Sequence, residues 1–417
     1  MNILSLDPMY SPLHQMIMDE AEDGGRFCIL SSFGLSVYFS SVHKFYFNKE
    51  LDAFKSKVST DLISLISNIP NHYRNLRLKV DNRALNEEEL NYFCCFYLYF
   101  ESFILNEDID LVLLHNDLRW QHSIAIEICK KYNVNYLVTE QGLFRPYTTI
   151  VDDFGVNAFS QVKLDFENKR KFIVSDIGCN IKSTHNSFFS YYKFTKYLLL
   201  SKLGKAIGYD SKYVHKRHTI SEYVIRFCKQ NLFVSKNVSN DKFTRRIVFV
   251  PLQLELDTQL LIHSDFNNNE EVIENISSSF FNCDKANDYD LVFKLHPNDT
   301  QNYKFDPRVK ITKSIIDDSF LDNVDLVISV NSTAVLNVLE TKIPVITIGR
   351  SIYDVEGVAQ YSSIDKLSSN IDSALRNEFS ISNRKNYIEY LKKEYSIHGA
   401  GYDYPVNEIK KILRKLS

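Results

Sequence analysis

Short apolar runs alternate with longer amphipathic segments along most of the chain. The short runs are rich in β-branched and aromatic residues, which is typical of strands, and the longer segments have the apolar spacing of helices. This alternation predicts repeated β-α-β units, parallel sheets and the α/β fold class. Strands are expected over residues 3–6, 27–31, 110–114, 135–138, 247–250, 291–295, 325–330 and 344–348. Helices are expected over residues 11–22, 51–69, 86–105, 120–132, 270–282, 334–341, 383–395 and 406–416.

The length of 417 residues predicts two domains, because it exceeds what one hydrophobic core usually covers. We expect an N-terminal domain over residues 1–235 and a C-terminal domain over residues 236–382. The helices of residues 383–417 are expected to pack back on the first domain.

A basic and aromatic connector is expected at about residues 187–218, where seven Lys or Arg accompany a single Asp. Interleaved cations and rings are typical of a segment that rests on an anionic membrane or a lipid-linked substrate. The alternative is an interdomain helix with a solvated basic face. The sequence leaves both interpretations open.

The net charge of −3 gives no basic excess of the kind that nucleic-acid-binding proteins show. The seven cysteines include no CxxC pair, and the N-terminus lacks the pattern of a secretory signal. We therefore expect a cytoplasmic protein, with peripheral contact at the inner face of the cytoplasmic membrane as an alternative.

Polar residues follow two expected strands of the second domain. The run 247–250 ends at Pro251 and leads to Asp257, and the run 291–295 ends at His296-Pro297. Ligands of open α/β sheets bind beyond the carboxyl ends of the strands. The sequence thus predicts that Asp257 and His296 line one crevice. The alternative for Asp257 is a loop carboxylate that bonds its own backbone in an Asx turn.

The first domain has a similar polar segment after residue 138. Glu140, Gly142 and Arg145 lie within six residues of one another at a strand end, which suggests an active-site loop. A charged surface turn is the alternative. Another expected strand ends at His115-Asn116-Asp117.

A third polar segment, Asn331-Ser332-Thr333, leads into an expected helix. Hydroxyl groups at a helix start can cap it, and the same free backbone N–H groups can bind phosphate. Both interpretations stay open. The chain has no HExxH, paired CxxC or Gly-rich dinucleotide motif, so we expect chemistry that needs neither a metal nor a cofactor.

Six segments, in order, resemble the bacterial capsule polysaccharide synthesis family and, within it, the retaining β-Kdo transferases. They are EQGLFRP (140–146), GVN (155–157), PLQLELDTQ (251–259), KLHP (294–297), SVNSTAVLNVL (329–339) and GRSIYD (349–354). The resemblance implies a GT-B fold, in which two Rossmann-like domains face a central cleft. It also implies metal-independent transfer of Kdo from CMP-Kdo, in β linkage, to a capsule or O-antigen glycan or its lipid anchor.

The resemblance also implies roles for individual residues. Asp257 falls at the position of the nucleophile, and Glu140 is the expected general acid/base for the acceptor hydroxyl. Related sialyltransferases carry two acidic residues before the Gly of the first motif, whereas here the second is Gln141. Asp152 or Asp153 is the reserve candidate. His296 is the third expected catalytic residue, in contact with the CMP phosphate or with the charge that develops on it. The expected contacts with the CMP phosphate or nucleotide are His296, Pro297, Lys294, Ser329, Asn331, Ser332 and Thr333.

The sugar carboxylate needs a cation, for which the candidates are Arg145, Lys294 and Arg350. Further candidates for contact with the sugar or the acceptor are Gln253, Asn157, His115 and Asn116. Two alternatives stay open: an inverting CMP-sialic-acid-type transferase with a structural Asp257, and a non-catalytic subunit of a capsule assembly or export complex. The expected partners are CMP-Kdo and a glycan or glycolipid acceptor.

Overall fold

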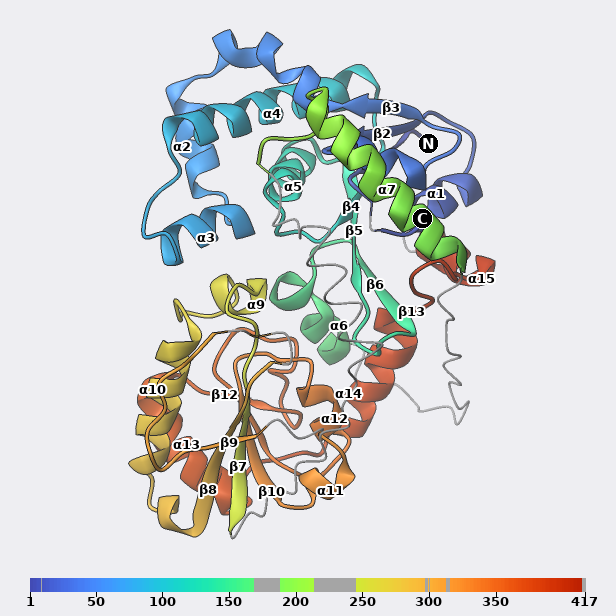
Figure 1. Ribbon diagram of the computed structural model, residues 1–417. Coiled ribbons are helices and arrows are strands. Elements are labelled where there is room, and N and C mark those ends of the chain that lie inside the picture. The colour runs from blue at the N-terminus through green and yellow to red at the C-terminus, as the bar shows by residue number, and fades with distance from the viewer. Residues whose placement is uncertain are drawn as a thin grey trace.

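The computed structural model describes residues 1–8, 10–168, 188–213, 245–296, 299, 301–312 and 316–414. These residues form two β-sheets, each flanked by helices, one above the other in Figure 1. The predicted α/β class is confirmed. The expected boundary at residues 235–236, residues 214–218 of the connector and Pro297 lie outside the described residues.

The N-terminal sheet has seven strands in the order β13-β6-β5-β4-β1-β2-β3. The strands from β5 to β3 pair in parallel, but β6 is antiparallel to β5, and β13 is antiparallel to β6. The expectation of parallel pairing therefore needs correction at this edge. The strands are β1 (Ile3–Leu6), β2 (Arg26–Leu30), β3 (His43–Tyr46), β4 (Leu111–His115), β5 (Asn135–Gln141), β6 (Thr148–Asp152) and β13 (Ser396–His398).

Helices cover this sheet, and one segment that was predicted as a single helix forms two shorter ones. The segment 51–69 was predicted as one helix, but Ser59 caps a new helix there by accepting from the backbone N–H of Leu62. The elements are α1 (Leu13–Glu20), η1 (Phe33–Tyr38), η2 (Phe47–Lys49), η3 (Leu51–Lys57), α2 (Thr60–Asn68), α3 (His72–Lys79), α4 (Glu87–Asn106), α5 (Trp120–Tyr132), η4 (Asn157–Phe159), α6 (Val162–Asn168) and α7 (Phe188–Ala206).

The C-terminal sheet has six parallel strands in the order β12-β11-β10-β7-β8-β9. Its strands are β7 (Arg246–Pro251), β8 (Tyr289–Lys294), β9 (Lys310–Thr312), β10 (Val324–Ser329), β11 (Val345–Thr347) and β12 (Gln360–Tyr361). The connecting helices are α9 (Thr258–Leu261), α10 (Asn269–Phe281), η5 (Ala286–Asp288), α11 (Asp318–Leu321), α12 (Val335–Leu339) and α13 (Ile364–Leu375). The central strand β7 is buried from its second residue onward, as a strand covered on both faces should be.

The C-terminal segment returns to the first domain. It contains α14 (Arg384–Tyr390), a π-helix (Leu391–Tyr395), β13 and α15 (Val406–Arg414). Strand β13 pairs with β6, and Ile409 and Ile412 of α15 share a core cluster with Leu13 and Ile17 of α1. The last strand of the N-terminal sheet, β13, therefore follows all strands of the C-terminal sheet in the sequence (Figure 1).

The carboxyl ends of the two sheets face each other. Leu118, just after β4, packs against Leu261 and Ile262, at the end of α9. The backbone N–H of His72 donates to the carbonyl of Leu118 at 2.8 Å, and its ring Nε2 lies 3.1 Å from the carbonyl oxygen of Leu256. Two α/β sheets whose carboxyl edges meet form the GT-B arrangement.

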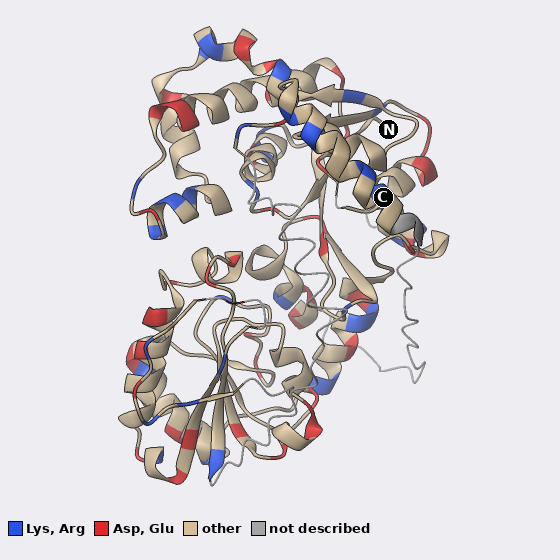
Figure 2. Ribbon diagram, in the orientation of Figure 1, with Lys and Arg blue, Asp and Glu red and all other residues tan. Residues whose placement is uncertain are grey.

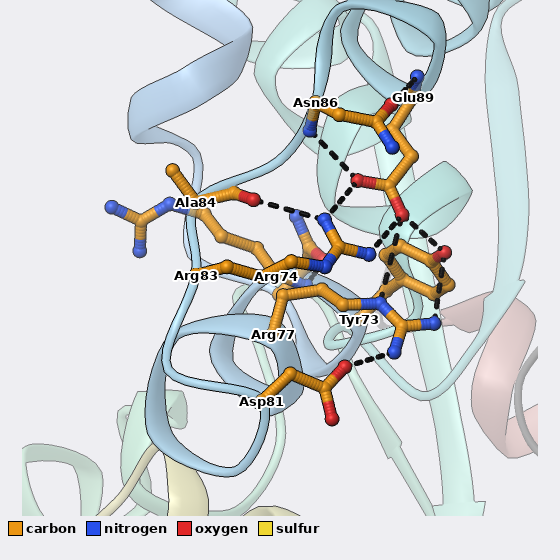
Figure 3. Close-up of polar contacts among 9 residues, drawn as sticks. Tyr73, Arg74, Arg77, Asp81, Arg83, Ala84, Asn86 and Glu89 are labelled. Atoms are coloured by element: carbon orange, nitrogen blue, oxygen red, sulfur yellow. Dashed lines mark hydrogen bonds and ion pairs between the residues drawn. The ribbon is translucent and has the colours of Figure 1, made fainter.

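Helix α3 is tied to the start of α4 by one buried carboxylate (Figure 3). Glu89 is 2% exposed and accepts hydrogen bonds from both terminal nitrogens of Arg83, each at 2.8 Å. It also accepts from the Tyr73 hydroxyl at 2.7 Å and from the backbone N–H of Asn86 at 2.8 Å. The Arg83 bonds are the main reason why the pKa of Glu89 is lowered to about 2. This cluster fixes α3, whose first residue, His72, reaches the second domain.

We expect Glu89→Gln to lower the free energy of unfolding by about 3 kcal/mol at about pH 7. Because the folded pKa lies below the ordinary 4.5, the carboxylate stabilises the fold above about pH 4.5, and this contribution disappears as the pH falls toward 2. Urea denaturation of the variant and the parent protein should therefore differ most at neutral pH. The matched control is Glu88→Gln, whose side chain is 71% exposed. Equal midpoints for the two variants would contradict the role of Glu89.

Candidate active site

Asp257 lies after the central strand β7, at the N-cap of α9. Its Oδ1 accepts from the backbone N–H of Gln259 at 3.0 Å and from the Thr258 hydroxyl at 3.3 Å. The side chain thus makes the Asx-type bond that the sequence left as an alternative. Its Oδ2 has no hydrogen-bond partner among the described residues, so one carboxylate oxygen is still available for chemistry.

Two histidines from different domains flank this carboxylate. His296 follows β8, and His72 begins α3 of the first domain. Burial lowers the pKa of each ring, and the negative charge of Asp257 opposes this shift in both. The His72 ring Nε2 lies 3.1 Å from the carbonyl oxygen of Leu256, so the neighbouring Asp257 lies where the two domains meet. The sequence did not identify His72, whose signal is limited to the Asn71 cap of an otherwise polar helix.

Glu140 lies near the end of β5 and is held by the loop after β4. Its Oε2 accepts from the Asn116 side-chain amide at 2.6 Å, and its Oε1 accepts from the backbone N–H of Gln141 at 2.8 Å. Asn116 adopts a left-handed conformation (φ 64°), which an Asn tolerates better than most residues do. Asn116 therefore positions Glu140, rather than presenting a free amide to an acceptor.

The reserve carboxylates make local contacts. Asp152 accepts through Oδ1 from the backbone N–H groups of Phe154 and Gly155, at 2.8 and 3.0 Å, which closes a turn. Asp153 is exposed. Asn157, in the same loop, is half-buried with a φ of 55°, and Phe159 stacks edge-on against His263 of the second domain, with ring centroids 4.9 Å apart. This loop therefore bridges the two domains.

His115 is 7% exposed, and its Nδ1 lies 3.2 Å from the Thr139 hydroxyl. The same hydroxyl lies 3.3 Å from Nε2 of His14, which is fully buried. Burial keeps the pKa of both rings well below 6.5, so both are neutral at physiological pH. His115 supports the strand end and faces the interior.

The expected phosphate segment lies between β10 and α12. Asn331 is 6% exposed and accepts from the Gln253 side-chain amide at 2.8 Å, so these two residues join the ends of β10 and β7. Ser329 is fully buried and accepts from the backbone N–H of Ser332 at 3.0 Å. Ser332 accepts from the backbone N–H of Ala334, and Thr333 is exposed. Helix α12 begins only at Val335, and its N-cap residue has no side-chain bond.

The three candidate cations differ in their surroundings. Arg350 pairs with Asp265 at 2.7 Å and donates to the carbonyl of Ile262, so it holds the loop after α9. Arg145 is exposed, donates from Nε to the carbonyl of Gly142 at 3.2 Å, and is not paired with a carboxylate among the described residues. Burial lowers the pKa of Lys294, which is half-buried. Arg350 is also exposed, so Arg145 differs from it in having no carboxylate partner in the described part of the chain.

Hydrogen bonds and short chain segments link Glu140 to Asp257. Glu140 bonds Asn116, two residues before Leu118, whose carbonyl accepts from His72. The His72 ring meets the carbonyl of Leu256, next to Asp257. The structure thus brings Glu140, Asp257 and His296 to the facing carboxyl edges of the two sheets.

Two further observations concern the rest of the described chain, a hollow away from these residues and a search for metal-binding groups. A hollow of about 490 Å³, lined by Arg246, Tyr289 and Val324 among others, lies at the amino ends of the C-terminal strands, away from these residues. No group of three or more His, Cys, Asp or Glu side chains has an arrangement that could hold a metal ion, as far as residues are described.

The fold and the site define a two-domain α/β protein with two carboxylates and two histidines between its sheets. A model of the capsule polysaccharide biosynthesis protein family matches residues 110–399, which include all six segments quoted above. The chain belongs to this family.

Relatives and solved structures extend the comparison. The chain is 25% identical over 296 residues to the capsule polysaccharide modification protein LipB of Neisseria meningitidis serogroup A, covering 64% of this chain and 70% of LipB. It is 24% identical to the capsule polysaccharide export protein KpsS of Escherichia coli, covering 60% and 70%. The Thermosulfurimonas dismutans KpsC β-Kdo 2,7 transferase structure has 15% identity and a TM-score of 0.41, with 82% of this chain and 95% of that chain covered.

Proposed function

We propose that this capsule polysaccharide biosynthesis protein is a glycosyltransferase that moves Kdo from CMP-Kdo, with retention and in β linkage, onto a capsule or O-antigen glycan or its lipid anchor. The observation that carries this proposal is Asp257, which follows the Leu256 carbonyl that His72 of the first domain contacts and whose Oδ2 is available. Retention needs two inversions, and therefore a group that attacks from the face opposite CMP.

In the first step Oδ2 of Asp257 bonds to the anomeric carbon as the bond from that carbon to the CMP phosphate oxygen breaks. In the second step the acceptor oxygen bonds to the same carbon, the bond to Asp257 breaks, and Glu140 takes the hydroxyl proton. Asn116 holds Glu140 for this transfer. His296 with Lys294, Ser332 and Thr333 would contact the CMP phosphate, and Arg145 the sugar carboxylate.

The test is incubation with CMP-Kdo and a set of glycan and glycolipid acceptors, followed by mass spectrometry and NMR of the product. A β-linked Kdo product supports the proposal. The product should form equally well with EDTA present, because we assign stabilisation of the charge on the departing CMP phosphate to side chains and not to a metal ion. Calorimetry with CMP separates this function from that of a non-catalytic assembly or export subunit. Absence of both CMP binding and transfer would favour the non-catalytic role.

One observation favours a second candidate, an inverting CMP-sialic-acid-type transferase. Oδ1 of Asp257 caps α9, which is a structural role that requires no chemistry. In that case Glu140 alone would activate the acceptor hydroxyl, and the product would have inverted configuration. The anomeric configuration read by NMR therefore distinguishes the two reactions.

We also propose that α7 rests on the anionic membrane that carries a lipid-linked acceptor. Lysines recur along this helix (Figure 2), and it contains no acidic residue. Apolar side chains between them are exposed, with Tyr192 at 56%, Leu199 at 62% and Leu203 at 49%. Exposed rings and leucines among lysines suit the interface of an anionic bilayer. Among the helices described, none is long and apolar enough to cross a membrane.

Replacing Lys196, Lys202 and Lys205 by Glu should weaken binding to phosphatidylglycerol vesicles by at least about 100-fold, because each lysine near an anionic surface contributes about 1 kcal/mol. Co-sedimentation measures this loss. The control replaces three exposed lysines of the second domain, Lys304, Lys342 and Lys366, by Glu. Equal vesicle binding by the two triple variants would remove α7 as the contact surface.

A further inference from the structure

A buried carboxyl group that the mechanism above does not use lies next to Asn116, the residue that holds Glu140. Asp117 follows Asn116 at the end of β4 and is 5% exposed. Its Oδ2 accepts from the backbone N–H of Val156 at 2.8 Å and lies 3.1 Å from the position where a Cβ on Gly155 would be. A side chain at position 155 would therefore crowd this carboxyl group.

The other oxygen of Asp117 has no partner. Oδ1 is buried without a hydrogen bond, and no Lys or Arg pairs with this side chain in the described residues. An ionised carboxylate that is buried with an unbonded oxygen is unfavourable, because it has lost its hydration without compensation. Protonation of Oδ1 relieves this penalty and converts the oxygen into a donor.

The negative charges near Asp117 also favour its protonated form. Glu140 of β5 and Asp152 of β6 both place negative charge near Asp117. On α5, the buried ring of His122 has its pKa lowered to about 3 and stays neutral, and Arg119 acts on the rings of His122 and His115. Burial, with Glu140 as the largest charge contribution, raises the pKa of Asp117 to about 7.

Glu140 lies on β5, and Asp117 lies in the loop after the neighbouring strand β4, next to the Asn116 that bonds Glu140. Tyr136 and Val138 point into one core cluster and Leu137 into the other, so Glu140 shares the face of the first two, and Gln141 lies on the opposite face. The second carboxyl group near Glu140 belongs to Asp117, in the loop after β4, whereas position 141 carries an amide.

We propose that Asp117 is a positioning residue that keeps a proton beside Glu140, so that the two carboxyl groups share a single negative charge and this charge stays on Glu140. The inference rests on the proposed function of Glu140 as the base. When the acceptor O–H bond breaks, its proton passes to Glu140, while Asp117 keeps its own. An ionised Asp117 would add a second negative charge near the anionic donor and disturb the Asn116 segment.

The first test needs no substrate. Because the folded pKa of Asp117 lies above its ordinary 3.8, stability is present at low pH and is lost as the pH rises toward about 7. The Asn of Asp117→Asn resembles the protonated carboxyl group and cannot ionise. The urea midpoint of this variant minus that of the parent protein should therefore increase as the pH is raised from about 4 to about 8. Asp61→Asn, at an exposed position on α2, should show no such trend. A midpoint difference for Asp117→Asn that is constant with pH would overturn the proposal.

The second test uses transfer. Activity of the parent protein should fall above about pH 7, and Asp117→Asn should keep its activity there, because its side chain cannot ionise. A purely structural role would lower activity equally at every pH, which would also overturn the proposal. If the parent protein transfers no sugar, the proposed function fails, and the denaturation series still decides whether Asp117 holds a proton.

Discussion

Asp257→Asn should abolish transfer while leaving CMP binding within about twofold of the parent protein. An amide nitrogen or oxygen is a poor nucleophile toward the anomeric carbon, so we expect a loss of at least about 1000-fold in kcat. Asn is as good an N-cap as Asp, so α9 and the loop that bears Gln259 should keep their positions. The measurement combines product formation with calorimetry of CMP binding.

The choice of Asn makes this experiment decisive between the two roles of the side chain. If Asp257 only caps α9, Asp257→Asn keeps the cap and full activity, and the nucleophile assignment is wrong. A matched control is Asp317→Asn, since Asp317 caps α11 through a bond of 2.9 Å to the backbone N–H of Phe320, at the opposite end of the same sheet. The control should transfer Kdo at the parent rate.

Glu140→Gln should slow turnover by about 100- to 10,000-fold, the usual range for loss of a general base. The Gln carbonyl oxygen can still accept the bond from Asn116, so the loop after β4 should keep its position, and only the bond from the exposed backbone N–H of Gln141 is lost. The first step does not need Glu140, so the variant should release about one CMP per protein molecule in a rapid burst and then nearly stop. Rapid-quench measurement of CMP release detects this burst.

Glu127→Gln is the control for Glu140→Gln, because Glu127 lies on α5 with its side chain 43% exposed. Parent-like steady turnover in Glu140→Gln would show that another group takes the acceptor proton. Loss of the burst together with turnover would favour the inverting reaction, in which the acceptor and its base are needed from the start.

Local sequence patterns predicted most of the fold. Buried strands such as β4 and β7 are apolar along nearly their whole length, and this pattern needs no tertiary information. Strand β6 was missed because it folds back antiparallel onto β5 from a segment that the sequence suggested as a loop. Strand β13 was missed because it has three residues and pairs with β6 across about 250 residues. Helix α3 was missed because its sequence, HYRNLRLK, has few apolar positions and its place is set by Glu89.

The site was partly predictable for a related reason. The ends of parallel strands converge by construction, so Asp257 and His296 could be paired from sequence, although their catalytic roles stay predictions. His72 lies near Asp257 only because the two domains pack together. Asp117 follows His115 and Asn116 in the sequence, and its distinguishing feature is an Oδ1 that is buried without a hydrogen-bond partner. Neither property is visible in the local residue pattern.

In the proposed mechanism, one gap between the domains holds Glu140, Asp257 and His296 around a single donor sugar. Intact-protein mass spectrometry can detect this sugar on the Glu140→Gln variant after the protein is mixed with CMP-Kdo, and digestion with peptide mapping then locates it. We expect the protein to gain the mass of one Kdo residue, on the peptide that contains Asp257, and added acceptor to remove this Kdo only slowly. Unmodified protein that nevertheless forms a product with retained configuration, or a sugar found on another residue, would contradict it.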